Sequence, residues 1–263
     1  MVVKGNFPGK IFEGIRYFIY LSLEQKIISM KQYKEYAEQF WKEGYLILEN
    51  FFSEEVMDNA NDMILNHYGM NPNWEHTDEF ITKSAVEVIP WFPYREGNTD
   101  LDTIDKDERM NAITDAILND SWNNLYCMAM FSKQGSKGQA WHQDCSPEDK
   151  LKYNLNRLVY THDITNETGG EIVLYPESHK TGVLPAGVPD ADIEGQMVYT
   201  PKKGTLIFLH GHCWHRVLPV KGPYRISSNF RVVPLGTQGD ITDICVYRNM
   251  RYKFSTSEIV ETR

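Results

Sequence analysis

The second half of the chain is a series of short apolar runs separated by turn residues, with no helical pattern between them. The strand-like runs cover 156–164, 171–175, 196–200, 205–210, 213–218 and 224–233. Strands that follow one another without intervening helices favour antiparallel sheets. We therefore predict a mainly β fold, either a sandwich or a flattened barrel, whose open end leaves room for a binding site.

The first half of the chain is predicted to be mostly helical and to support this β core. Apolar residues recur at helical spacing through 31–43, and Gly44 ends that helix. A short buried strand is expected over 45–49, Ser53 caps a second helix, and a third covers 107–119. We expect these helices to pack on the outer face of one sheet.

One domain is expected, since length gives a prior of between one and two at about 150 residues each. The chain of 263 residues contains no repeat and no long Pro/Gly linker. We divide it into helical support (1–120), a β core (121–235) and a C-terminal extension (236–263). The first 30 residues lack a signal-peptide pattern, and no apolar run reaches the ~20 residues that span a bilayer. A cytoplasmic protein is expected.

Charge and cysteine content exclude several classes of protein. The chain carries 27 basic and 36 acidic residues, a net charge of −9, which argues against nucleic acid or an anionic membrane as partner. Its four cysteines form no CxxC pair and are too few for a disulfide framework, so we expect reduced thiols. A small-molecule substrate is compatible with this composition.

A short polar motif in an apolar context, Trp141-His142-Gln143-Asp144, indicates chemistry. In a strand, His142 and Asp144 project to the same face and so can hold one metal ion. An imidazole and a carboxylate with open positions suit non-haem Fe(II), provided that a second histidine completes the set. The pair alone is a weak signal, because it arises by chance and also fits a hydrogen-bonded surface pair.

A second cluster, about 70 residues later, supports the metal interpretation. His215 is followed ten residues on by Arg225, and Ser227 comes two residues after that. A hairpin that turns at 219–223 would bring Arg225 beside the strand that carries His215. A guanidinium with a neighbouring hydroxyl binds a carboxylate through charge-assisted hydrogen bonds. A ligand that chelates iron at one end and is an acid at the other, such as 2-oxoglutarate, needs this combination.

With these motifs the chain resembles the Fe(II)/2-oxoglutarate-dependent oxygenases, and more narrowly the phytanoyl-CoA dioxygenase-like superfamily. The resemblance runs from about Tyr36 to Pro234. Besides the His-x-Asp motif it rests on the segments 40–52, 166–180 and 204–215. It implies a double-stranded β-helix, the jelly roll of cupin-like proteins, with the N-terminal helices packed on one sheet.

The resemblance also implies the roles of individual residues. His142, Asp144 and His215 would be the catalytic metal ligands, and Arg225 with Ser227 would bind 2-oxoglutarate. The implied reaction converts 2-oxoglutarate and O2 to succinate and CO2 while an unactivated C–H bond of a small molecule is hydroxylated or otherwise oxidised. Desaturation and ring formation stay open, because they start in the same way.

Asp144 and the neighbouring histidines refine this interpretation. Halogenating relatives have Ala or Gly at the position of Asp144, so the resemblance implies oxidation and not halogenation. His210 and His212 lie close to His215, but only His215 has an arginine ten residues on. We assign His215 as the ligand and leave the roles of the other two open.

The substrate and its contacts are less determined by the sequence. Candidate substrate residues are Trp91, Phe131, Lys133, Arg157 and Trp214, with core packing or surface exposure as the alternative for each. A cupin-type metal enzyme that does not use 2-oxoglutarate predicts the same three ligands without the arginine and serine. A non-catalytic binding module of the same fold is a further alternative. Whether the protein is a monomer or a homo-oligomer stays undecided.

Overall fold

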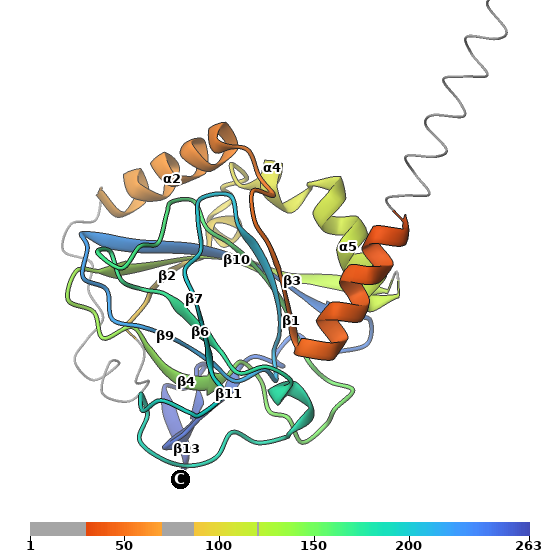
Figure 1. The fold of residues 1–263 in the computed structure, drawn as a ribbon, viewed down its shortest axis with the longest axis vertical. Helices are drawn as coiled ribbons and strands as arrows, with labels where there is room; N and C mark the ends of the chain where they lie inside the picture. Colours follow the sequence, from red (N-terminus) through yellow and green to blue (C-terminus); the bar gives the residue numbers. More distant parts are fainter. Residues whose placement is uncertain (1–29, 70–86, 120) are drawn as a thin grey trace, which may run out of the picture.

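Two antiparallel sheets face each other in the computed structural model, which describes residues 30–69, 87–119 and 121–263 (Figure 1). The first sheet has six strands in the order β1-β8-β5-β10-β3-β2, and the second has seven in the order β13-β12-β11-β4-β9-β6-β7. This confirms the predicted mainly β, jelly-roll architecture, in which the chain passes repeatedly from one sheet to the other.

Most of the strands coincide with the apolar runs of the sequence. The first sheet contains β1 (Tyr45–Leu48), β2 (Ile89–Trp91), β3 (Trp122–Lys133), β5 (Leu155–Val159), β8 (Leu206–His210) and β10 (Tyr224–Pro234). The second contains β4 (Gln139–Gln143), β6 (Ile172–Leu174), β7 (Met197–Tyr199), β9 (His215–Val217), β11 (Ile244–Tyr247), β12 (Met250–Lys253) and β13 (Glu258–Thr262).

The helices lie along the six-stranded sheet, as predicted (Figure 1). They are a helix over 30–43, α2 (Glu54–Gly69), α4 (Asp102–Asp105) and α5 (Glu108–Leu118), with 3-10 turns η1 (Pro93–Glu96) and η2 (Ser178–Lys180). The Ser53 hydroxyl accepts a hydrogen bond from the backbone N–H of Val56 at 3.4 Å, which caps the start of α2.

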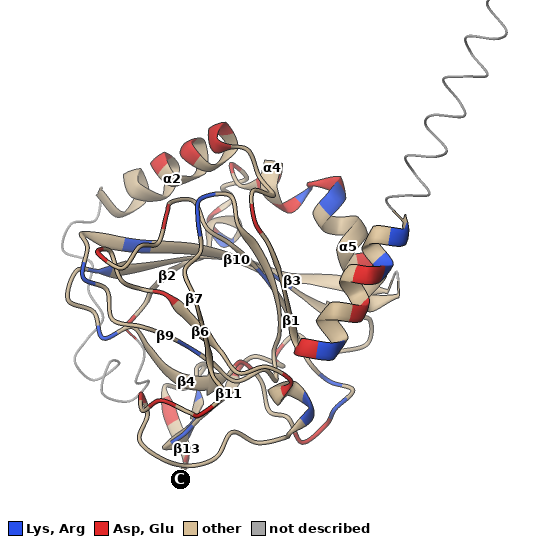
Figure 2. Ribbon diagram, in the orientation of Figure 1, with Lys and Arg blue, Asp and Glu red and all other residues tan. Residues whose placement is uncertain are grey.

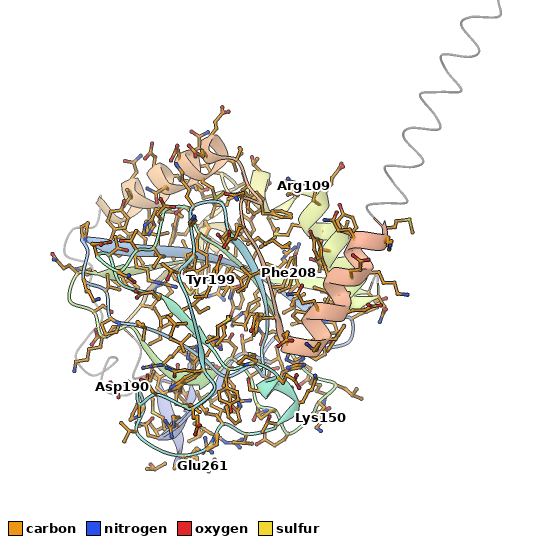
Figure 3. The ribbon with its side chains drawn as sticks, viewed as in Figure 1. Arg109, Lys150, Asp190, Tyr199, Phe208 and Glu261 are labelled. Carbon is orange, nitrogen blue, oxygen red and sulfur yellow. The ribbon has the colours of Figure 1, made fainter. Side chains whose placement is uncertain are left out.

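The largest apolar cluster lies between these helices and the sheet. Phe40, Met57 and Ile113 come from three different helices and pack against sheet residues that include Leu206 and Phe208. Each fully buried side chain of this size contributes about 1.5–3 kcal/mol to folding. Figure 3 shows Phe208 of this cluster among the strands. The opposite, outer side of α2 carries acidic residues (Figure 2). The helices therefore cover the outer face of one sheet and leave free the space between the two sheets.

The segment that joins β9 to β10 differs from the prediction. β9 pairs with β4 and β6 in one sheet, whereas β10 pairs with β3 and β5 in the other. The prediction of a hairpin at 219–223 is therefore wrong. Val220 instead forms a bridge to Gly169 and donates to the backbone carbonyl of Ser136, because this segment crosses between the sheets.

The C-terminal extension adds three strands to the seven-stranded sheet. β11 pairs with β4, so that Tyr247 stands opposite His142 and Val246 opposite Gln143. β12 and β13 continue the sheet to its edge. The extension is thus hydrogen-bonded to the strand that carries the first candidate ligand. None of the helices in the described parts of the chain is long and apolar enough to cross a membrane.

Candidate active site

The three predicted metal ligands meet in the interior between the sheets. His142 lies near the end of β4, Asp144 follows that strand, and His215 begins β9, directly opposite His142. One donor atom from each of the three lies within 4.8 Å of the others, and all three residues are buried. His142 Nε2 is 3.8 Å from Asp144 Oδ1, and His215 Nε2 is 3.7 Å from Asp144 Oδ2. This arrangement suits a single metal ion.

Backbone carbonyls fix the tautomer of both imidazoles. His142 Nδ1 lies 2.8 Å from the carbonyl oxygen of Ala140, and His215 Nδ1 lies 2.9 Å from that of Cys213. A carbonyl oxygen only accepts, so both Nδ1 atoms carry hydrogen and both Nε2 lone pairs are free for a metal. Burial, together with the neighbouring His215, lowers the pKa of His142 to about 3, which keeps its ring neutral.

Asp144 is held through one of its two oxygens. Asn156 Nδ2 donates to Asp144 Oδ2 at 2.6 Å, and Arg231 Nη2 lies 3.2 Å from the same oxygen. Burial alone would raise the pKa of Asp144, but the charges of Arg231 and the two histidines outweigh it and hold the pKa below its ordinary value. The carboxylate is therefore ionised, as a metal ligand must be.

The orientation of the Asn156 amide follows from its partners. Arg231 Nε donates to Asn156 Oδ1 at 2.7 Å, and Asn154 and Asn229 donate to the same oxygen at 3.0 and 2.8 Å. Because a guanidinium only donates, Oδ1 is the acceptor, and the amide nitrogen faces Asp144. Neither Arg231 nor Asn156 was expected from the sequence. Arg231 had a signal, since it lies six residues after Arg225 and so points to the same side of β10.

Arg225 and Ser227 also lie together, as expected, but on the opposite sheet from His215. Arg225 donates to the carbonyl of Gly170 at 2.7 Å, to Ser227 Oγ at 3.0 Å and to Tyr160 Oη at 3.3 Å. Only 2% of Arg225 is exposed, and no acidic side chain among the described residues forms an ion pair with it. A buried guanidinium that makes no direct ion pair is suited to the carboxylate of a ligand.

Both groups of residues open into one cavity of about 710 Å³, which is a typical size for a small-molecule site. His142, Asp144 and His215 line it, as do Arg225 and Ser227. Much of the remaining wall is apolar and comes from four regions of the chain: Val88, Pro90, Phe92, Leu125, Met128, Met130, Leu158 and Phe254. The cavity therefore offers a metal site, a carboxylate site and an apolar space together.

The five candidate substrate residues lie outside the lining of this cavity, and strand alternation explains why. On β3, Met128 and Met130 line the cavity, so Phe131 and Lys133 point to the other face. Phe131 stacks on Tyr68 there, with ring centroids 4.4 Å apart.

The same alternation applies to the other three candidates. Arg157 on β5 points toward the helices, where it forms an ion pair with Asp105 at 2.8 Å. Trp91 stacks on His67 at 3.9 Å, and Trp214 packs against Tyr175 at 5.3 Å. These three residues have structural partners and do not reach the cavity.

His210 and His212 lie outside the three-residue group. The ring of His210 stacks on Tyr153 with centroids 4.4 Å apart, next to Phe40 of the first helix. The backbone carbonyl of His212 accepts a hydrogen bond from Gln143 Nε2 at 2.8 Å. His210 thus packs behind the site, and His212 supports the loop before His215.

The sequence matches the family model described as phytanoyl-CoA dioxygenase (PhyH) over residues 40–224, which is more than half of the chain. The chain belongs to the phytanoyl-CoA dioxygenase family. No curated protein sequence matches it. Arg225 and Ser227 lie directly after the matched segment, and the strands β11–β13 lie well beyond it.

Solved structures of similar fold include several iron enzymes. HygX from Streptomyces hygroscopicus, with nickel and 2-oxoglutarate bound, has a TM-score of 0.60 at 14% identity, covering 76% of this chain and 86% of that chain. The epimerase SnoN, in complex with Fe3+, alpha ketoglutarate and nogalamycin RO, has a TM-score of 0.59 at 14% identity, with 83% and 86% covered. The carbocyclase SnoK from nogalamycin biosynthesis has a TM-score of 0.58 at 13% identity, with 81% and 85% covered.

The phytanoyl-CoA dioxygenase family depends on Fe(II) and 2-oxoglutarate, and the residues of this chain fit both. Two neutral imidazole nitrogens and one ionised carboxylate form the donor set that non-haem Fe(II) prefers. The buried cation of Arg225 fits the far carboxylate of 2-oxoglutarate.

Proposed function

We propose that this protein is an Fe(II)/2-oxoglutarate-dependent dioxygenase that hydroxylates an unactivated C–H bond of a small molecule. The observation that carries the proposal is the meeting, in one cavity, of three metal-binding side chains and a buried arginine that forms no ion pair within the described residues. The three metal ligands alone are not sufficient, because a metal site without Arg225 would equally fit a cupin-type enzyme that does not use 2-oxoglutarate.

His142, Asp144 and His215 would hold the iron, and Arg225 with Ser227 would hold the far carboxylate of 2-oxoglutarate. Bound Fe(II) and 2-oxoglutarate supply the oxidising chemistry, in which decarboxylation of 2-oxoglutarate to succinate is coupled to oxidation of a C–H bond by O2. The carbonyls of Ala140 and Cys213 hold the two imidazole rings in the orientation that a metal needs.

The surrounding side chains orient the ligands and exclude water. Arg231 and Asn156 fix one oxygen of Asp144, so that the other faces His142. Apolar groups such as Met128 and Phe92 cover the cavity wall and limit the water that would compete with substrate oxidation. The chain thus contributes binding, orientation and a dry surface, while the cofactor supplies the chemistry.

Hydroxylation is the simplest reaction of such a site, but an enzyme of this fold can also catalyse other oxidations. The structurally similar SnoN is an epimerase and SnoK a carbocyclase, so the same fold supports different oxidations. Asp144 occupies the position that halogenating enzymes leave open, which argues against halogenation. The product mass distinguishes three classes of reaction: a gain of one oxygen indicates hydroxylation, a loss of two hydrogens indicates desaturation or ring closure, and an unchanged mass indicates epimerisation.

The first test is formation of the Fe(II)–2-oxoglutarate complex under anaerobic conditions, followed through its visible absorption band, and then succinate release in air. Arg225→Ala should weaken 2-oxoglutarate binding by at least about tenfold, the usual effect of losing one partner of a buried charge-assisted pair. Arg251→Ala is a matched control, because Arg251 pairs with Glu261 on the extension and does not line the cavity. Equal affinities in the two variants would reject the carboxylate site.

A further inference from the structure

The C-terminal extension places a tyrosine against the metal site. Tyr247 lies on β11 opposite His142 of β4, and their rings stack with centroids 5.5 Å apart and an interplanar angle of 22°. Cys245 lies on the same face of β11, and its thiol donates to the backbone carbonyl of Asp144 at 3.3 Å. Both side chains line the cavity.

Tyr247 differs from the other tyrosines of this cavity in its hydrogen bonding. Tyr126 Oη accepts from Arg231 at 2.5 Å, and Tyr160 Oη accepts from Arg225 at 3.3 Å. Tyr247 lines the same cavity, and no described residue forms a hydrogen bond with its hydroxyl, which is therefore available to a ligand of the cavity.

Strand pairing places this tyrosine beside the metal ligands. Tyr247 is the register partner of His142, and Cys245, two residues before it on β11, donates to the carbonyl of Asp144. The backbone around Tyr247 is held by its own bonds, since Arg263 donates to the Tyr247 carbonyl at 2.8 Å.

We propose that the Tyr247 hydroxyl donates a hydrogen bond to an oxygen of the substrate, next to the carbon that is oxidised. This inference rests on the proposed function and deepens it. The far carboxylate of 2-oxoglutarate would lie at Arg225, which donates to Gly170 just before β6, whereas Tyr247 lies on β11, on the other side of the ligand strand β4 from β9 and β6. 2-Oxoglutarate would therefore extend from the metal away from Tyr247, which leaves this hydroxyl to the other ligand of the cavity. The substrate is then a molecule with an apolar body and a carbonyl, ether or hydroxyl oxygen beside its reacting C–H bond.

The rest of the cavity wall agrees with an apolar body. Phe92 and Leu125 come from the first sheet and its flanking turn, and Phe254 follows β12 of the extension. Residues of the extension thus form the side of the cavity that faces away from the helices. β11, which carries Tyr247, lies outside the segment matched by the family model.

The test compares two fluorinated probes that differ by one oxygen, 5-fluoro-1-indanone and 5-fluoroindane. Their affinities are measured by 19F NMR on the full chain loaded with Mn(II) and 2-oxoglutarate, where paramagnetic relaxation reports closeness to the metal. The wild-type protein should bind the ketone roughly fivefold more tightly than the hydrocarbon, as one neutral hydrogen bond predicts. Tyr247→Phe keeps the ring on His142 and should reduce this preference to within about twofold. Only the affinity for the ketone should fall, whereas the affinity for the hydrocarbon should stay the same.

Tyr126→Phe is the matched control, because it removes a phenol hydroxyl of the same cavity whose partner is Arg231. This variant should keep the preference for the ketone. The proposal is overturned if wild-type protein binds both probes equally, binds neither near the metal, or if Tyr247→Phe retains the preference. Formation of the Fe(II)–2-oxoglutarate absorption band is measured in parallel: its absence rejects the proposed function, whereas a normal band with equal probe affinities rejects the role of Tyr247 alone.

Discussion

Asp144 is bound from one side and open on the other. Its Oδ2 atom contacts Asn156 and Arg231, while Oδ1 faces the Nε2 atom of His142. Because the two oxygens have different partners, the carboxylate can offer one oxygen to a metal without losing its hydrogen bonds. One-oxygen coordination leaves other positions around an iron ion free for 2-oxoglutarate and O2.

Removing this carboxylate should strongly weaken metal binding. Asp144→Ala deletes a ligand and leaves Arg231 buried beside no anion, so Mn(II) affinity should fall by more than the 10–100-fold that is typical of losing an outer partner. Isothermal titration with Mn(II) measures the affinity, and Asp149→Ala, at an exposed loop position, provides the control. An Asp144→Ala protein with wild-type Mn(II) affinity would show that the metal lies elsewhere.

Arg231 should stabilise the metal-free protein more than the metal-bound protein. It is the nearest cation to Asp144 when no metal is present, and breaking such a buried pair costs about 3–5 kcal/mol. A bound divalent cation supplies the missing positive charge, so Mn(II) should raise the unfolding free energy of Arg231→Met more than that of wild type. Urea denaturation with and without Mn(II) tests this. Equal gains in the two proteins would contradict it.

At the scale of elements, the turn before β6 sets the position of Arg225. Gly170 has φ +82°, and its carbonyl accepts from Arg225 Nε. A Cβ atom at this position would lie 2.5 Å from Arg225 Cδ, closer than any real contact. The glycine is therefore required for two reasons, its left-handed backbone and the approach of the arginine side chain.

These two reasons can be separated by a pair of substitutions. Gly236→Ala introduces the same backbone strain, at φ +88°, but its Cβ meets nothing within 4 Å. Both variants should lose about 1 kcal/mol or more of stability from strain. Only Gly170→Ala should also displace Arg225 and raise the KM for 2-oxoglutarate, by about tenfold for a lost charge-assisted contact. A similar rise in Gly236→Ala would indicate a general effect of strain.

Alternation along strands explains both what the sequence predicted and what it did not. His142 and Asp144, and likewise Arg225 and Ser227, were placed correctly on one face because each pair is two residues apart. The same rule, applied to neighbours, would have excluded Trp214 beside His215. The hairpin at 219–223 was wrong because a turn sequence does not tell whether the next strand joins the same sheet or the opposite one. Asn156 carried no signal, since its role depends on Arg231 and Asp144 from distant strands.

At the scale of the whole molecule, folding keeps several histidines neutral. His162 Nε2 accepts a hydrogen bond from the backbone N–H of Ile226 at 2.9 Å, which requires an unprotonated nitrogen. Burial lowers the pKa of His162 to about 4, with the charge of Arg225 adding to the effect, and burial lowers that of His212 to about 4 as well. When the chain unfolds, the pKa of each ring returns to its ordinary value of about 6.5.

Stability should therefore fall as the pH decreases from about 6.5 to about 4. In this window the unfolded chain binds protons that the folded chain does not, so the free energy of unfolding rises with pH and levels off above about 6.5. Each such histidine contributes a slope of up to about 1.4 kcal/mol per pH unit. In urea titrations at pH 4.5–6.5, His162→Gln should lower the slope of the unfolding free energy against pH by roughly the contribution of one histidine. Lys150→Ala, at an exposed position, should leave the slope unchanged. An unchanged slope in His162→Gln would mean that its ring takes up a proton in the folded protein, and that the bond from Ile226 does not hold it neutral.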